Sequence, residues 1–117
     1  MTIKELIEDF GFGNSQSTIQ REAKLNNYIG KQVEIICHIG DITNYSIQIG
    51  QLMWGNNFTS HSFALKLVFD KEKFGQQLLK YFFDDKVKII AILRLVDLST
   101  RDPSYEFELF SIDKLKK

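Results

Sequence analysis

The sequence has little cysteine and little proline, and it carries no excess charge of either sign. With only one cysteine, Cys37, no internal disulfide can form, which predicts a reducing and therefore cytoplasmic location. The single proline leaves no room for a proline-rich linker. Fifteen basic and fifteen acidic side chains cancel, so no overall field attracts a polyanion. These numbers disfavour a protein that binds DNA by charge alone, but they leave a local basic groove open.

Long apolar runs are also missing. No segment approaches the roughly 20 consecutive apolar residues of a transmembrane helix, and residues 1–9 carry acids where a secretory signal has an apolar stretch. We therefore expect no membrane partner. The 117 residues, 44% hydrophobic and 26% charged, suit a single globular unit. Their wealth of Ile, Lys, Asn and Phe suggests an AT-rich bacterial genome or a mobile element.

Two capping boxes predict helices near the start of the chain. Thr2 with Glu5 forms the first box, and Ser17 with Gln20 forms the second. The apolar residues that follow the first box and share one helix face are Ile3, Leu6, Ile7 and Phe10. We therefore assign residues 1–29 to an N-terminal helical extension.

From residue 31 onward the apolar pattern has a period of two, which indicates strands. A helical pattern interrupts it between Asp70 and the pair Asp84 and Asp85, where Phe74, Leu78, Leu79 and Phe82 recur at helical spacing. The expected strands cover residues 33–42, 47–54, 63–69, 87–95 and 105–112. Three strands, a helix and two strands are the element order of a five-stranded Greek-key barrel, in which the helix closes an open end.

Two short motifs resemble those of OB-fold domains of the tRNA-anticodon-binding or single-stranded-DNA-binding type. Residues 30–33, Gly-Lys-Gln-Val, are similar to the Gly-Lys-x-Val start of such domains. Residues 79–89 resemble their helix and the Gly-Asp-x-Val start of the next strand, except that Asp84 stands where glycine is usual. The resemblance implies a mainly β, five-stranded OB-like barrel over residues 30–117, with a helix between strands 3 and 4.

The resemblance also implies non-catalytic binding of single-stranded nucleic acid, with DNA favoured over RNA. In OB-fold domains, strands two and three and the adjoining loops bind the ligand, through aromatic side chains that stack on bases and cations that meet phosphates. The candidate binding residues on this surface and its flanking loops are Tyr45, Trp54, Phe58, His61, Lys66, Arg94, Arg101 and Tyr105.

Structural roles compete with binding at these positions. Trp54 and Phe58 flank a turn, and Trp54 is equally suited to a stacking platform and to a cap over the barrel mouth. Tyr45 and Tyr105 suit a strand edge better than stacking. Lys66, Lys88 and Arg94 lie on the polar faces of their expected strands, and each of them, considered alone, fits a solvated position better than a phosphate contact.

Catalytic and metal-binding motifs are missing from the sequence. Cys37 and His38 are adjacent on an expected strand and point to opposite faces, so they cannot form a nucleophile–base pair. We expect Cys37 in the core and His38 at the surface. No Cys or His spacing is typical of zinc sites, and no glycine-rich phosphate loop follows a strand. We therefore expect the protein not to be an enzyme and to bind neither a cofactor nor a metal ion.

Two other functions remain open. The N-terminal apolar stripe, extended by Phe12, suits the groove of a protein partner or a second copy of the chain. The protein would then be an interaction module, such as an inhibitor or a subunit of a replication-type complex. Docking of the stripe on its own barrel is the favoured interpretation. A binder of oligosaccharides or small ligands is the third class.

Overall fold

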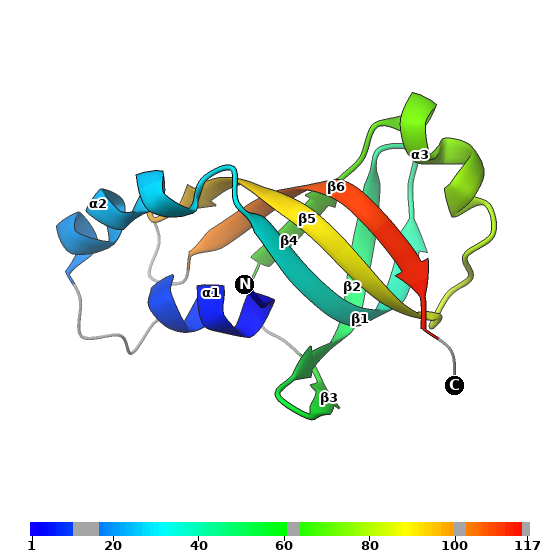
Figure 1. Ribbon diagram of the computed structural model, residues 1–117, viewed down its shortest axis with the longest axis horizontal. Coiled ribbons are helices and arrows are strands. Elements are labelled where there is room, and N and C mark those ends of the chain that lie inside the picture. Colours follow the sequence, from blue (N-terminus) through cyan, green and yellow to red (C-terminus); the bar gives the residue numbers. More distant parts are fainter. Residues whose placement is uncertain (11–16, 61–63, 100–102, 116–117) are drawn as a thin grey trace.

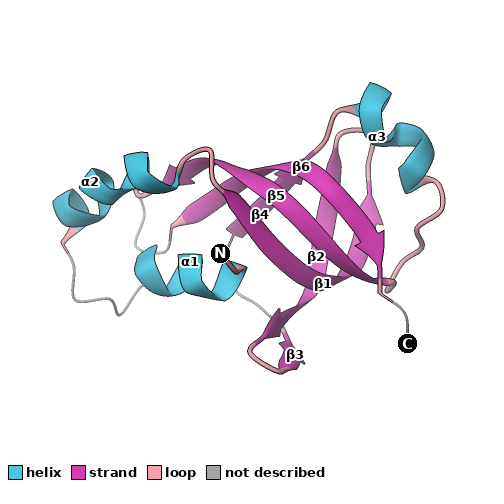
Figure 2. Cartoon of the chain, viewed as in Figure 1, coloured by secondary structure: helices cyan, strands magenta, loops and turns pink. Residues whose placement is uncertain are grey.

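The computed structural model describes residues 1–10, 17–60, 64–99 and 103–115 (Figure 1). Within these ranges the chain forms three helices and six strands (Figure 2). Their bounds are α1 Ile3–Phe10, α2 Thr18–Tyr28, β1 Gln32–Ile42, β2 Ser46–Trp54, β3 Asn57–Thr59, β4 Ala64–Val68, α3 Lys71–Leu78, β5 Lys86–Asp97 and β6 Ser104–Lys114. Four residues for which the sequence carries expectations lie outside the described residues: Phe12, His61, Phe63 and Arg101.

Five of the strands close a barrel. β1 pairs antiparallel with β2 and with β5, β5 pairs antiparallel with β6, β6 runs parallel to β4, and β4 returns antiparallel to β2. β3 folds back on the end of β2 as a hairpin that extends from the barrel (Figure 1). Because α3 lies between β4 and β5 in the chain, the predicted order of a five-stranded Greek-key barrel with a helix between its third and fourth strands is confirmed.

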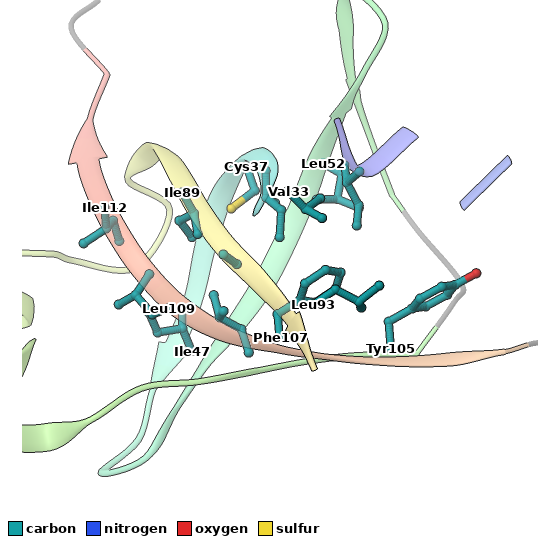
Figure 3. Packing of buried hydrophobic residues seen from close by; sticks show 14 of the residues in the cluster. Val33, Cys37, Ile47, Leu52, Ile89, Leu93, Tyr105, Phe107, Leu109 and Ile112 are labelled. Atoms are coloured by element: carbon teal, nitrogen blue, oxygen red, sulfur yellow. The ribbon is translucent and has the colours of Figure 1, made fainter. Parts of the chain in front are cut away.

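Alternate residues of the strands point inward and form the core (Figure 3). The buried residues of β1, and those of β6 as far as Leu109, follow the predicted period of two: Val33, Ile35, Cys37, Ile39, Tyr105, Phe107 and Leu109. The placement of Cys37 in the core is therefore confirmed. In β6 the next buried residue is Ile112, beyond a register shift against β5.

The apolar face of α1 is buried against the chain's own barrel. Its four apolar residues are at most 8% exposed and belong to the same core cluster as the strands: Ile3, Leu6, Ile7 and Phe10. The predicted cap is present, with the Glu5 amide donating to Thr2 Oγ1 at 3.2 Å. The Glu34 amide of β1 donates to the Met1 carbonyl at 2.8 Å and so fastens the start of the chain to the barrel. A protein partner or a second copy held by this face is not supported.

α2 rests on α1. Its predicted capping box is present, with the Gln20 amide donating to Ser17 Oγ at 3.3 Å. The Phe10 and Tyr28 rings meet edge to face, with 5.2 Å between their centroids. The Tyr28 hydroxyl donates to the Asp9 carboxylate, and this hydrogen bond raises the pKa of Tyr28. The two helices therefore hold each other at one side of the barrel.

The helix between β4 and β5 is shorter than predicted. α3 ends at Leu78, and Leu79 and Phe82, which the pattern placed on its buried face, are 74% and 69% exposed. Tyr81 takes the inward position instead, since its hydroxyl donates to the Ile112 carbonyl at 3.2 Å. The prediction that the helix continues beyond Leu78 is therefore wrong.

The inward face of β5 also changes phase near its end. Against β6, the register shifts between Leu93 and Leu95, as in a β-bulge, where one strand carries an extra residue. Val96 is consequently buried, whereas Leu95 is 54% exposed. In the expected strand 87–95 the period of two places Leu95 on the same face as Leu93, and this expectation is wrong for that reason.

Asp84 adopts a left-handed backbone, with φ of +70°. Such a conformation favours glycine, which accounts for the glycine that is usual at this place in the resembled motif. The turn is held on β1, because the Asp84 amide donates to the Ile39 carbonyl at 2.8 Å and the Ile39 amide donates to the Asp85 carbonyl at 2.9 Å. The Asp84 side chain contributes a contact of 3.0 Å between its Oδ1 and His38 Nδ1.

We expect Asp84→Val to lower the free energy of unfolding by about 1–2 kcal/mol, because a β-branched residue tolerates this backbone poorly. The free energy of unfolding of Asp84→Gly should stay within about 1 kcal/mol of that of the parent protein. Glycine adopts the positive φ without strain, and this gain offsets the lost contact with His38 and the greater entropy of the unfolded chain. Urea unfolding measures both. Equal losses in the two variants would mean that the His38 contact, and not the backbone, dominates.

Candidate nucleic-acid interface

The turn between β1 and β2 presents Tyr45 to solvent. Its side chain is 62% exposed. Backbone bonds hold the turn on both sides: the Thr43 amide donates to the Ser46 carbonyl at 2.9 Å, and the Phe69 amide donates to the Tyr45 carbonyl at 3.0 Å. Tyr45 is thus an exposed aromatic ring on a fixed backbone, as a base-stacking residue requires.

Trp54 and Phe58 lie together on the β2–β3 hairpin. Trp54 is half-buried and packs against the core. Phe58 is half-buried too, with its ring 4.4 Å from the His38 ring in an edge-to-face contact. Lys86 Nζ lies 5.5 Å from the Phe58 centroid. Both aromatic side chains therefore have structural contacts, and a cation adjoins the second.

The two described candidate cations each face a carboxylate of β6. Lys66 Nζ lies 3.8 Å from Glu106 Oε1, and Arg94 donates from Nε to Glu108 Oε2 at 2.7 Å. All four side chains are at least 37% exposed. Exposed ion pairs of this kind contribute at most about 1 kcal/mol, so a phosphate can compete for the cations.

Tyr105 lies inside the barrel and is only 2% exposed. Tyr105 is a candidate because it flanks the loop before β6, but it alternates with Phe107 and Leu109 on the inward face of that strand. Tyr105 is therefore a core residue and cannot stack on a base. His61 and Arg101 are outside the described residues.

Two exposed aromatic residues that the sequence reasoning missed lie after α3. Phe82 and Phe83 are 69% and 80% exposed, and both line a pocket of about 540 Å³ between this segment and the β1–β2 turn. A signal was present in the sequence, because three consecutive aromatic residues at 81–83 exceed what one face of a helix can bury.

Cys37 and His38 point to opposite sides of β1, as predicted. The Cys37 thiol is fully buried, and burial raises its pKa to about 12. His38 faces outward, with 15% of its side chain exposed, between Phe58 and Asp84. Among the described residues, no three His, Cys, Asp or Glu side chains gather as metal ligands do.

We expect the thiol of the native protein to resist a maleimide at pH 8. A rise in pKa from 9.0 to about 12 lowers the thiolate fraction by about a thousandfold, in addition to the steric protection. Mass spectrometry should find no adduct before denaturant is added and one adduct per chain afterwards. Rapid native labelling would show instead that β1 separates from its neighbours.

None of the described helices is long and apolar enough to cross a bilayer. No protein-family model matches the chain, and no curated protein matches its sequence. Solved structures do match: two crystal forms of Rim1, a mitochondrial single-stranded DNA binding protein from S. cerevisiae. The first has a TM-score of 0.53 at 14% identity and covers 74% of this chain and 94% of the Rim1 chain. The second has a TM-score of 0.52 at 16% identity, with coverages of 74% and 95%.

The chain has an OB fold. In this fold the second and third barrel strands correspond to β2 and β4. Among the described residues these strands pair at Ser46 with Val68 and at Ile47 with Leu67. The exposed side chains of the OB-fold surface then include Tyr45 at one end of β2 and Lys66 on β4.

Proposed function

We propose that the protein is a non-catalytic binder of single-stranded nucleic acid, with DNA favoured over RNA. The observation that supports this most is the extent of the structural similarity, since 94% of the chain of a single-stranded DNA binding protein is covered. OB folds bind single strands by stacking bases on exposed aromatic side chains. Tyr45 supplies such a ring at the β1–β2 turn. DNA is favoured because the matched Rim1 is a single-stranded DNA binding protein.

The charges of the protein predict a shallow dependence on salt. The net charge is zero, and Lys66 and Arg94 each lie beside a glutamate. If these two cations meet phosphates, the logarithm of the affinity should fall with that of the salt concentration with a slope of about −1.4. Stacking then provides more of the affinity than the backbone contacts do.

Fluorescence anisotropy of a labelled oligothymidine of about 16 nucleotides tests this function at low and at moderate salt. We expect Tyr45→Ala to weaken binding by at least about fivefold, the lower limit for one lost stack. Ile19→Ala, which changes a 75% exposed residue on α2, is the matched control and should bind as the parent does. No binding by the parent protein at low salt would refute the proposal.

The cytoplasmic location belongs to the proposal too, and it rests on the lone thiol of Cys37. The alternative function as an interaction module has lost its main support, because the apolar face of α1 is buried within the chain. The DNA titration also separates the third class, since a binder of oligosaccharides would not respond to an oligonucleotide.

A further inference from the structure

The pocket beside α3 combines apolar and polar walls. It has a volume of about 540 Å³, within the range of sites for small organic ligands. Phe82 and Phe83 line it from the segment after α3, and Asp41, Asn44 and Gln48 line it from the other side. Gln48 Oε1 already accepts from the Asp41 amide at 3.4 Å. A purely apolar ligand would desolvate the side chains of Asp41 and Asn44 without giving them a hydrogen-bond partner, so the ligand should have both a flat apolar face and a polar edge.

The two phenylalanine rings are held at the surface by a fixed turn. The Phe82 amide donates to Asp85 Oδ2 at 2.8 Å, and this bond lowers the pKa of Asp85, as does Lys114. On the far side the Asp84 amide is bonded to β1. Exposed aromatic rings on so constrained a backbone lose little entropy when a ligand covers them.

A lysine of the pocket wall suits a phosphate. Lys71 of α3 lines the pocket. Lys114 Nζ lies 5.6 Å from the Phe82 centroid and is paired with Asp85 at 3.3 Å. The carboxylate of Asp41 and the amides of Asn44 and Gln48 offer the acceptors and donors that base edges need. Stacking rings, polar groups for a base edge and a lysine together match a nucleotide.

The pocket also adjoins the exposed tyrosine of the β1–β2 turn. Asn44 lines the pocket, and the next residue, Tyr45, projects into solvent. The Tyr45 carbonyl is bonded to Phe69, another lining residue, at 3.0 Å. A strand that stacks on Tyr45 can therefore continue into the pocket that Phe82 and Phe83 line.

We propose that this pocket is a nucleobase subsite, into which a single strand bound at Tyr45 continues and stacks on Phe82 and Phe83. The proposal rests on the proposed function and adds a binding position at α3 to the β2–β4 surface.

Photo-cross-linking of the full chain to an oligothymidine that carries 5-iodouracil locates the stacked bases directly. Trypsin separates the two surfaces, because residues 81–86 form one peptide with Phe82 and Phe83, whereas residues 32–66 form another with Tyr45, Trp54 and Phe58. We expect adducts on both peptides. Adducts on 32–66 without any on 81–86 would overturn the subsite and leave the proposed function intact, and a failure of the oligonucleotide to bind would overturn both.

Anisotropy titrations of variants give a second test. Phe82→Ala and Phe83→Ala should each weaken binding of the oligothymidine by about fivefold or more. Because both rings are largely exposed, neither change should unfold the protein. Phe110→Ala, which removes a 47% exposed ring of β6 that does not line the pocket, is the aromatic control and should leave the affinity unchanged. Parent-like affinity in both Phe82→Ala and Phe83→Ala would refute the subsite.

Discussion

Phe10→Ala is expected to lower the free energy of unfolding by about 3–5 kcal/mol, the range for a fully buried phenylalanine. The Phe10 side chain is 0% exposed and joins the core of the barrel, and its ring also contacts Tyr28 of α2. One change would therefore remove packing at both the barrel and α2. Since small domains have about 5–15 kcal/mol in total, much of the stability is at stake. Urea unfolding followed by far-UV circular dichroism measures the loss.

Ile19→Ala is the control for this experiment, because Ile19 lies on the neighbouring helix with 75% of its side chain exposed. It should change the stability by less than about 0.5 kcal/mol. The division into an extension of residues 1–29 and a barrel of residues 30–117 is tested as well. A cost below about 1 kcal/mol for Phe10→Ala would mean that α1, although buried in the same core, does not unfold together with the barrel.

Gly50→Val should destabilise the protein by about 3 kcal/mol, at the upper end of the range for overpacked sites. A Cβ at Gly50 would lie 2.9 Å from the His38 carbonyl oxygen. That oxygen belongs to the backbone of β1, so no side-chain rotation relieves the clash, and β1 and β2 would have to separate. Thermal and urea unfolding should both report the loss.

Gly75→Ala provides the opposite case. A Cβ there would make an ordinary contact, 3.5 Å from Lys71 Cγ, and the residue lies within α3. Alanine should therefore stabilise the helix by about 0.5–1 kcal/mol. If Gly50→Val were as stable as the parent protein, the close approach of β1 and β2 would not be a requirement of the fold.

The sequence predicts the barrel well because strand alternation is a local property. In the stretches from Val33 to Ile39 and from Tyr105 to Leu109, every second residue faces inward, as the period of two predicts. Pairing with another strand overrides this pattern at Leu95, where the register shift turns the side chain outward. A local pattern cannot contain such a shift, since it arises between two strands.

The candidate site was predictable only in part. Tyr45 is exposed because a short turn cannot bury its side chain, and this follows from the turn itself. The pocket joins residues 40–48 to residues 69–83, which are distant in sequence, so it exists only after β4 and α3 have been placed against the β1–β2 turn. For the same reason, the sequence alone does not show that Phe82 and Phe83 line a pocket.

The sequence by itself determines the order of the helices and of the five barrel strands, the caps of α1 and α2, and the inward faces of most strands, since each depends on residues a few positions apart. It does not show the short strand β3. The tertiary structure alone decides that α1 covers its own barrel and not a partner, that Leu95 turns outward, and that α3 ends early with Tyr81 turned toward Ile112. These outcomes depend on which surfaces meet, and burial is a property of such pairs of surfaces rather than of one segment.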